Sequence, residues 1–96
     1  MELLGLEHFS GCLNETFETE IDGMAMRFTL VEAQPLPSGN PQRKRDPFSL
    51  LFLNEAAVVF PQKVYSLRHP RLGTTGIFLV PIARNRDGFI YQAVFN

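Results

Sequence analysis

The chain has few of the residues that carry chemistry in small proteins: its 96 residues include one cysteine, two histidines and no tryptophan. The single Cys12 excludes an internal disulfide, so folding has to be driven by packing. No apolar run approaches the roughly 18 residues of a membrane-spanning helix, and the first residues lack the basic start of a signal peptide. We expect a cytoplasmic protein with no membrane partner; incorporation into a released particle would leave the same signature.

Motifs of known chemistry are also missing. The chain has no Gly-x-Ser-x-Gly elbow, and its glycines are scattered at turns, so no Gly-rich loop could hold a phosphate. Cys12 lies in an apolar stripe beside Leu13, which is typical of a buried small side chain. Only His8, His69 and Cys12 could bind a soft metal; His8 and Cys12 are an i, i+4 pair, but the spacing of the three matches no zinc pattern. We expect no enzyme activity, no catalytic residue, no metal and no cofactor.

The most informative feature present is Asp22-Gly23, because it lies between two alternating runs. Asp-Gly supplies the positive φ angles of a two-residue turn. Counting outward from the turn, one face is almost entirely apolar, and the other carries charged and small side chains. The apolar face holds three facing pairs, Ile21 with Met24, Thr19 with Met26, and Phe17 with Phe28. This pattern predicts an antiparallel hairpin with one buried face.

The whole chain reads as one mainly antiparallel β domain, residues 1–96, of about six strands. A short helix within residues 3–13, ending near Ser10-Gly11, would plug one end of the sheet. A small barrel and a barrel-like sandwich both fit this pattern. The strands are expected at residues 15–21, 24–34, 48–53, 63–69, 74–83 and 89–95.

Three connections are less regular. Residues 35–47 contain four prolines and no hydrophobic period, which predicts one long loop. Residues 56–60 fit either a short strand or a connection. Asn85 to Gly88 predicts a hairpin between the last two strands, and loops of four or five residues fit it equally well.

Charge is unevenly distributed around a net value of −1: residues 1–34 hold seven acids and one base, and residues 48–96 hold five bases and two acids. Acidic and basic strands lying side by side would neutralise each other, or the molecule has two opposite sides suited to head-to-tail contacts. The one basic cluster, Arg43-Lys44-Arg45, is the candidate partner-binding loop. It could meet phosphate or become ordered on a protein partner. The acidic first hairpin and the net charge argue against nucleic acid.

Four local patterns stand out: Leu6-Glu7-His8-Phe9, Pro47-Phe48-Ser49-Leu50-Leu51-Phe52, His69-Pro70-Arg71-Leu72-Gly73, and Tyr91-Gln92-Ala93-Val94-Phe95-Asn96. On these patterns, over nearly its whole length, the chain resembles a family of small bacterial domains of unknown function associated with genes for phage-tail-collar-like proteins. The resemblance implies a single β domain that is accessory to a larger assembly. It supplies no catalytic residue.

Together these observations predict a non-enzymatic structural or interaction module, linked to a phage-tail-like assembly, whose partner is another protein. The terminal apolar strand would offer an edge to another chain, and edge strands would also allow a homo-oligomer. Two alternatives stay open. One is a single-stranded nucleic-acid-binding barrel, and the other is a carrier whose interior holds an apolar ligand. The carrier's interior would be lined by Phe17, Phe28, Phe52, Tyr65 and Phe89.

Overall fold

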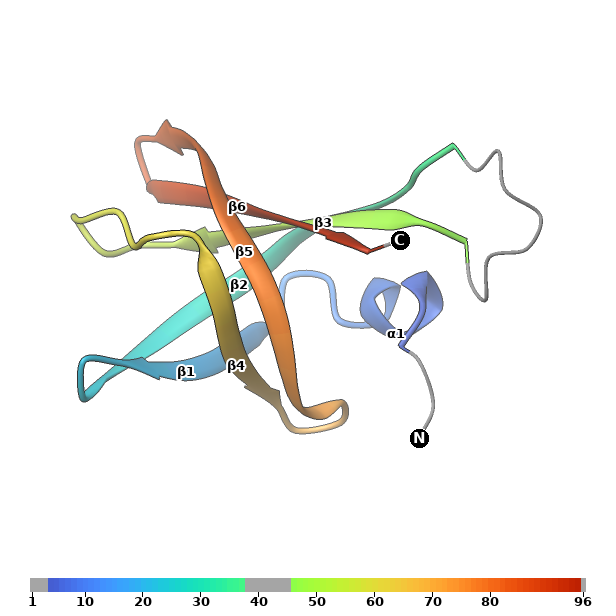
Figure 1. Cartoon of the computed structure of the whole chain (residues 1–96), viewed down its shortest axis with the longest axis horizontal. Helices are drawn as coiled ribbons and strands as arrows, with labels where there is room; N and C mark the ends of the chain where they lie inside the picture. Colours follow the sequence, from blue (N-terminus) through green and yellow to red (C-terminus); the bar gives the residue numbers. More distant parts are fainter. Residues whose placement is uncertain (1–3, 38–45, 96) are drawn as a thin grey trace.

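The chain folds into a closed antiparallel barrel of six strands with one short helix, in a computed structural model that describes residues 4–37 and 46–95 (Figure 1). The strand order around the barrel is β1-β2-β3-β6-β5-β4. The predicted fold class is therefore confirmed, and the barrel is the correct alternative. The elements are α1 (Leu6–Ser10), β1 (Thr16–Ile21), β2 (Met24–Pro35), β3 (Phe48–Asn54), β4 (Lys63–His69), β5 (Gly73–Asn85) and β6 (Gly88–Phe95).

The first hairpin has the predicted register. Ile21 pairs with Met24 and Phe17 with Phe28. Asp22 and Gly23 take φ angles of 53° and 79°, as a two-residue hairpin turn requires. On the apolar face Phe17, Ile21 and Phe28 are buried and Met26 is partly buried, whereas the side chain of Met24 is 60% exposed.

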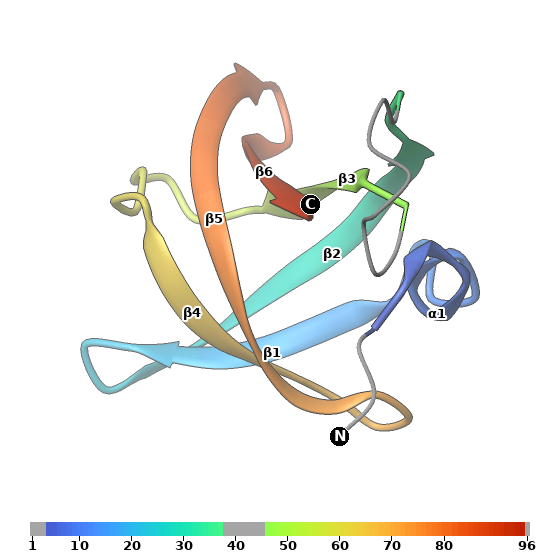
Figure 2. The ribbon, with the colours of Figure 1, turned by 45° about the vertical axis from the view of Figure 1, so that its right-hand side comes forward.

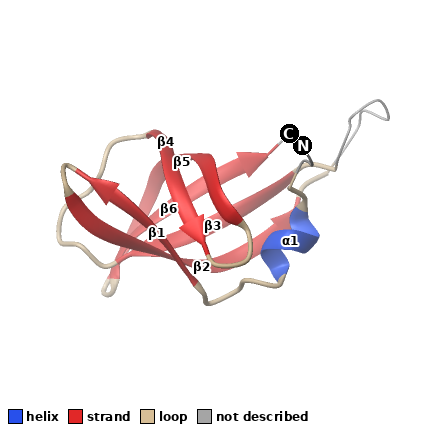
Figure 3. Ribbon diagram, turned by 90° about the horizontal axis from the view of Figure 1, so that it is seen from below, coloured by secondary structure: helices blue, strands red, loops and turns tan. Residues whose placement is uncertain are grey.

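The helix plugs one end of the barrel, as predicted, but spans only Leu6–Ser10 (Figure 3). Its one fully buried side chain, Phe9, packs against three core rings, with centroid distances of 6.3 Å to Phe17, 5.9 Å to Phe48 and 5.6 Å to Phe95. The helix begins after Gly5, whose N–H donates to Nδ1 of His8 at 2.8 Å. That bond occupies one ring nitrogen of His8 at the helix start.

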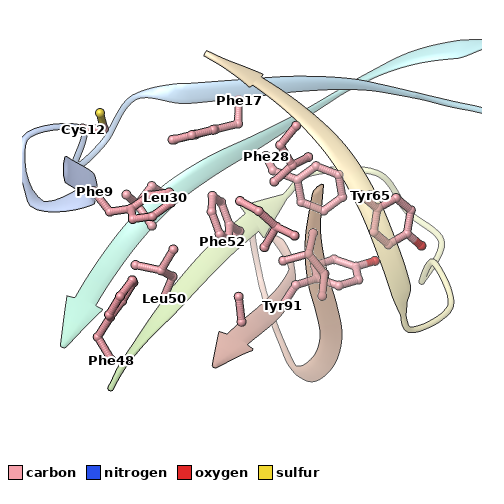
Figure 4. Close-up of a cluster of buried hydrophobic side chains, with 14 of the residues drawn as sticks. Phe9, Cys12, Phe17, Phe28, Leu30, Phe48, Leu50, Phe52, Tyr65 and Tyr91 are labelled. Carbon is pink, nitrogen blue, oxygen red and sulfur yellow. The ribbon is translucent and has the colours of Figure 1, made fainter. Parts of the chain in front are cut away.

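Aromatic rings fill the interior (Figure 4). Phe28 is fully buried and lies 5.2 Å from the ring of Tyr91 and 6.0 Å from that of Tyr65. Phe17 meets Phe52 edge-on at 5.4 Å. A barrel of few strands has room only for its own side chains. Four of the five residues expected to line a ligand cavity therefore form the packed core.

Two connections resolve what the sequence left open. Residues 55–62 are a connection without strand structure, and two buried phenols hold it in place. The Tyr65 hydroxyl donates to the Pro61 carbonyl at 2.5 Å, and the Phe60 N–H donates to the Tyr91 hydroxyl at 2.8 Å.

Between β5 and β6, Asn85 pairs with Gly88. The loop therefore holds only Arg86 and Asp87, and the expectation of four or five residues was wrong. The Asn85 side chain explains the tight turn, since its Oδ1 accepts N–H bonds from both Asp87 and Gly88.

Truncation of Phe28 should be far more costly than truncation of Glu18. Phe28→Ala removes a fully buried ring and should lower the free energy of unfolding by about 3–5 kcal/mol. Glu18→Ala should change it by about 0.5 kcal/mol or less, because the Glu18–Arg68 ion pair is 3.8 Å long and mostly exposed. Urea unfolding measures both, with Phe28→Leu as the milder core variant. Equal effects of the two alanine variants would contradict the assigned hairpin faces.

Candidate functional site

The predicted partner-binding loop residues Arg43, Lys44 and Arg45 lie outside the described residues. Among the helices of the described ranges, none has the length and apolar character needed to cross a membrane. Of the candidate metal ligands, the structure brings Cys12 and His69 together, but not His8. The Cys12 thiol donates instead to the His8 carbonyl, at 3.5 Å.

Cys12 and His69 belong to a cluster that joins the start of β1 to the end of β4. One oxygen of Glu15, Oε1, accepts from His69 Nε2 at 2.7 Å and from Arg71 Nη2 at 2.6 Å. Arg71 Nη2 also lies 3.6 Å from the Cys12 sulfur. In the described register, β1 and β4 share one pair, Glu18 with Arg68. The cluster therefore reinforces a weak point in the closure of the barrel.

The hydrogen bonds of this cluster oppose metal binding. His69 Nδ1 accepts N–H bonds from Arg71 at 3.1 Å and Leu72 at 3.4 Å, so the proton of the neutral ring is on Nε2, which donates to Glu15. A metal on Nε2 would require a proton on Nδ1, facing two N–H donors, whereas metal-binding histidines donate that proton to an acceptor. The Arg71 guanidinium also places a positive charge between the other two ligand atoms.

The same bonds keep His69 from acting as a general base for Cys12. Neither ring nitrogen of His69 has a lone pair directed at the sulfur, and the thiol is 1% exposed. Catalysis by a cysteine needs a partner that takes up its proton. Cys12 is buried, as its apolar surroundings predicted, and the bonds of the cluster link the segment before β1 to the turn after β4.

A groove of about 390 Å³ lies outside the barrel, where β2 separates from the end of β3. Its walls include Ala25, Arg27 and Thr29 of β2 and the segment from Leu53 to Ala56. Asn54 also lines the groove and donates from its side-chain amide to the Arg27 carbonyl at 2.9 Å, and none of the lining residues is aromatic. The groove is therefore separate from the ring-filled interior, and it does not provide the enclosed apolar cavity that a carrier needs.

The most distinctive surface is the outside of four neighbouring strands, β3, β6, β5 and β4. Alternation along each strand turns one set of side chains outward, and here most of that set is apolar, although it includes Gln92, Ser66 and Arg68. Exposed fractions are 62% for Val64, 50% for Phe78 and 51% for Val94. Charged side chains border this surface, with Lys63 and Arg68 at the two ends of β4. We call it the outer apolar face: Leu51, Leu53, Val64, Phe78, Val80, Ile82, Ile90 and Val94.

Comparison with known proteins identifies the chain's relatives at the level of a domain family. The model of a family described as "Domain of unknown function (DUF6916)" matches residues 4–95. The chain belongs to the DUF6916 family. The resemblance to an uncharacterised domain family is thus confirmed. Searches of curated proteins and of solved structures returned no match.

Sequence reasoning missed the outer apolar face of this DUF6916 domain, although a signal was present. Residues 77–80, Ile-Phe-Leu-Val, are apolar on both faces of β5. A closed barrel buries only one face of each strand, so the second apolar face has to point outward. Glu15 was missed for another reason: its contacts with His69 and Arg71 span 54 and 56 residues and exist only once the barrel closes.

The hydrogen bond from His69 lowers the pKa of Glu15, and Arg71 adds to this effect. A lowered folded-state pKa means that the ionised carboxylate stabilises the fold above the unfolded-state pKa of about 4.3. This contribution is lost as pH falls through the lower, folded-state value. Glu15→Gln should therefore weaken the acid dependence of stability, measured as urea midpoints between neutral and acidic pH. Glu20→Gln, exposed on β1, should keep the wild-type dependence. An unchanged pH profile in Glu15→Gln would contradict this account.

Proposed function

We propose that this domain is a non-enzymatic interaction module that binds another protein through the outer apolar face. The supporting observation is the exposure of Val64, Phe78 and Val94 on adjacent strands, with bases at the ends of β4 and at Arg84 near the end of β5. Val64 and Phe78 face each other across β4 and β5, so their side chains form one surface. Contiguous exposed apolar patches of this kind mark interaction sites in soluble proteins.

The other functions have less support in the structure. The nucleophile is buried and the buried histidine is bonded on both nitrogens, which favours a role without catalysis. The aromatic core occupies the space that a carried ligand would need. Acidic side chains on the outside of β1 disfavour a nucleic acid backbone. We further propose that the partner belongs to a phage-tail-like assembly. This part of the proposal rests on the family resemblance in the four sequence patterns.

Partner capture with matched surface variants tests this function. Tagged wild-type protein is incubated with lysate of the source organism, and bound proteins are quantified by mass spectrometry. Phe78→Lys should reduce recovery of a near-stoichiometric partner by about tenfold or more, because aromatic side chains dominate the affinity of apolar interfaces. Val58→Lys is the control: this valine is 60% exposed, but it lies in the connection between β3 and β4.

Two results would contradict the proposal. One is a partner that Phe78→Lys retains as well as wild type does, since the outer apolar face would then not be the binding surface. The other is recovery of the domain alone as a monomer, since the lysate would then contain no protein partner for the outer apolar face. Both variants change exposed positions, so each should fold with wild-type stability to within about 0.5 kcal/mol.

A further inference from the structure

The pairing between β5 and β6 covers only part of their length. It runs from the turn at Asn85 and Gly88 to Val80 and Gln92, and ends there in the described register. Beyond that point β5 continues along β4, while β6 continues along β3 to Phe95. Figure 2 shows the two strands diverging from their shared turn. The expectation that the terminal strand offers a free edge is therefore wrong for most of β6, which has strands on both sides, and applies only near its end.

Main-chain groups point into the space between the diverging strands. In an antiparallel sheet, successive residues direct their N–H and C=O groups to opposite neighbours. Counting from the two-residue turn places the main-chain groups of Val80 and Gln92 toward each other. The same alternation directs the N–H and C=O groups of Gly76, Phe78 and Val94 into this space, where the described register gives them no strand partner. We call this interrupted part of the pairing, at Gly76 and Phe78 of β5 and Val94 of β6, the β5–β6 opening.

The β5–β6 opening lies within the outer apolar face. Phe78 borders it on β5 and Val94 on β6, each about half exposed. The neighbouring strand β4 carries the bases Lys63 and Arg68, of which Arg68 also lies 3.8 Å from Glu18, and β5 carries Arg84. Unpaired strand edges recognise an extended polypeptide, apolar neighbours select apolar side chains, and a basic margin selects acidic flanks.

We propose that the β5–β6 opening binds an extended, apolar, acid-flanked segment of another protein, which inserts as an additional strand between β5 and β6. This inference rests on the proposed function and specifies its partner. The added strand would use the main-chain groups of Phe78 on one side and Val94 on the other. Its outward side chains would pack against Phe78 and Val94.

A second copy of the domain is a poorer occupant. The opening is bordered by a strand on each side, so the proposed insertion requires a lone strand and excludes the edge of a sheet that brings its own neighbour. In the closed order β1-β2-β3-β6-β5-β4, every strand already lies between two others. The described strands of a second copy therefore offer no lone segment, whereas an extended segment of a different protein does.

Peptide binding tests strand insertion. A displayed library of random linear peptides is selected against the full chain, and affinities of the best binder are measured for wild type, Val94→Pro and Val94→Ala. Both variants remove the valine side chain, but only proline removes the N–H that points into the opening. Proline is tolerated where a strand N–H has no ladder partner, so the variant should fold. We expect Val94→Pro to bind about tenfold more weakly than Val94→Ala, the effect of losing one hydrogen bond.

N-methylation of the selected peptide gives the second readout. In a strand inserted between two others, successive N–H groups donate alternately to the neighbour on one side and the neighbour on the other. Methylation of either of two adjacent central residues should therefore weaken binding about tenfold. Sensitivity at alternate residues only would show addition to a single edge, and insensitivity would show docking without strand pairing. Either result would overturn the inference, as would failure to select any peptide.

Other outcomes separate this inference from the proposed function. Self-association that Phe78→Lys abolishes would assign the face to a second copy and overturn both. A captured partner that depends on Phe78, combined with equal peptide binding to Val94→Pro and Val94→Ala, would overturn strand insertion and leave the interaction module intact.

Discussion

The packing of aromatic rings inside the barrel is the constraint on which the rest of the structure depends. Six strands enclose little more than their own side chains, and here Phe28, Phe52 and Tyr91 fill that space. The helix adds Phe9 at one end, so the core is continuous from the helix to the phenols that hold residues 55–62. Because the interior is occupied, the proposed recognition uses the outside, which carries acidic side chains on β1 and an apolar face on β3 to β6 bordered by the bases Lys63, Arg68 and Arg84.

Closing so few strands around this core requires strong twist, which makes neighbouring strands cross and diverge. Two of the pairings are therefore incomplete. Between β1 and β4 the ladder holds one described pair, and the bonds from His69 and Arg71 to Glu15 reinforce it. Between β5 and β6 the ladder ends at Val80, with Phe78 and Val94 exposed beyond it. The first incomplete pairing is closed by side chains, and the second is where we propose that a partner strand binds.

Most of the fold could be predicted from the sequence, because its signals are local. Alternation and the Asp22-Gly23 turn predicted the first hairpin to the residue, and each of the six strands lies within two residues of its expected bounds. Strand order, barrel closure and the cluster around Glu15 depend on contacts between distant segments, which no local pattern encodes. The outer apolar face was missed because an apolar residue such as Phe78 is expected in the core. Only the closed topology shows which side of β5 faces the interior.

Amide hydrogen exchange on the isolated domain tests the central claim most directly, because it asks whether the β5–β6 opening exists before any partner binds. Adjacent residues on the same strands serve as internal controls, since their N–H groups point to opposite neighbours. The account predicts fast exchange at Gly76, Phe78 and Val94 and protection at Ile77, Leu79 and Ala93, whose ladders with β4 and β3 are intact. Equal protection of both sets would show that β5 and β6 pair along their whole length, and would contradict the account.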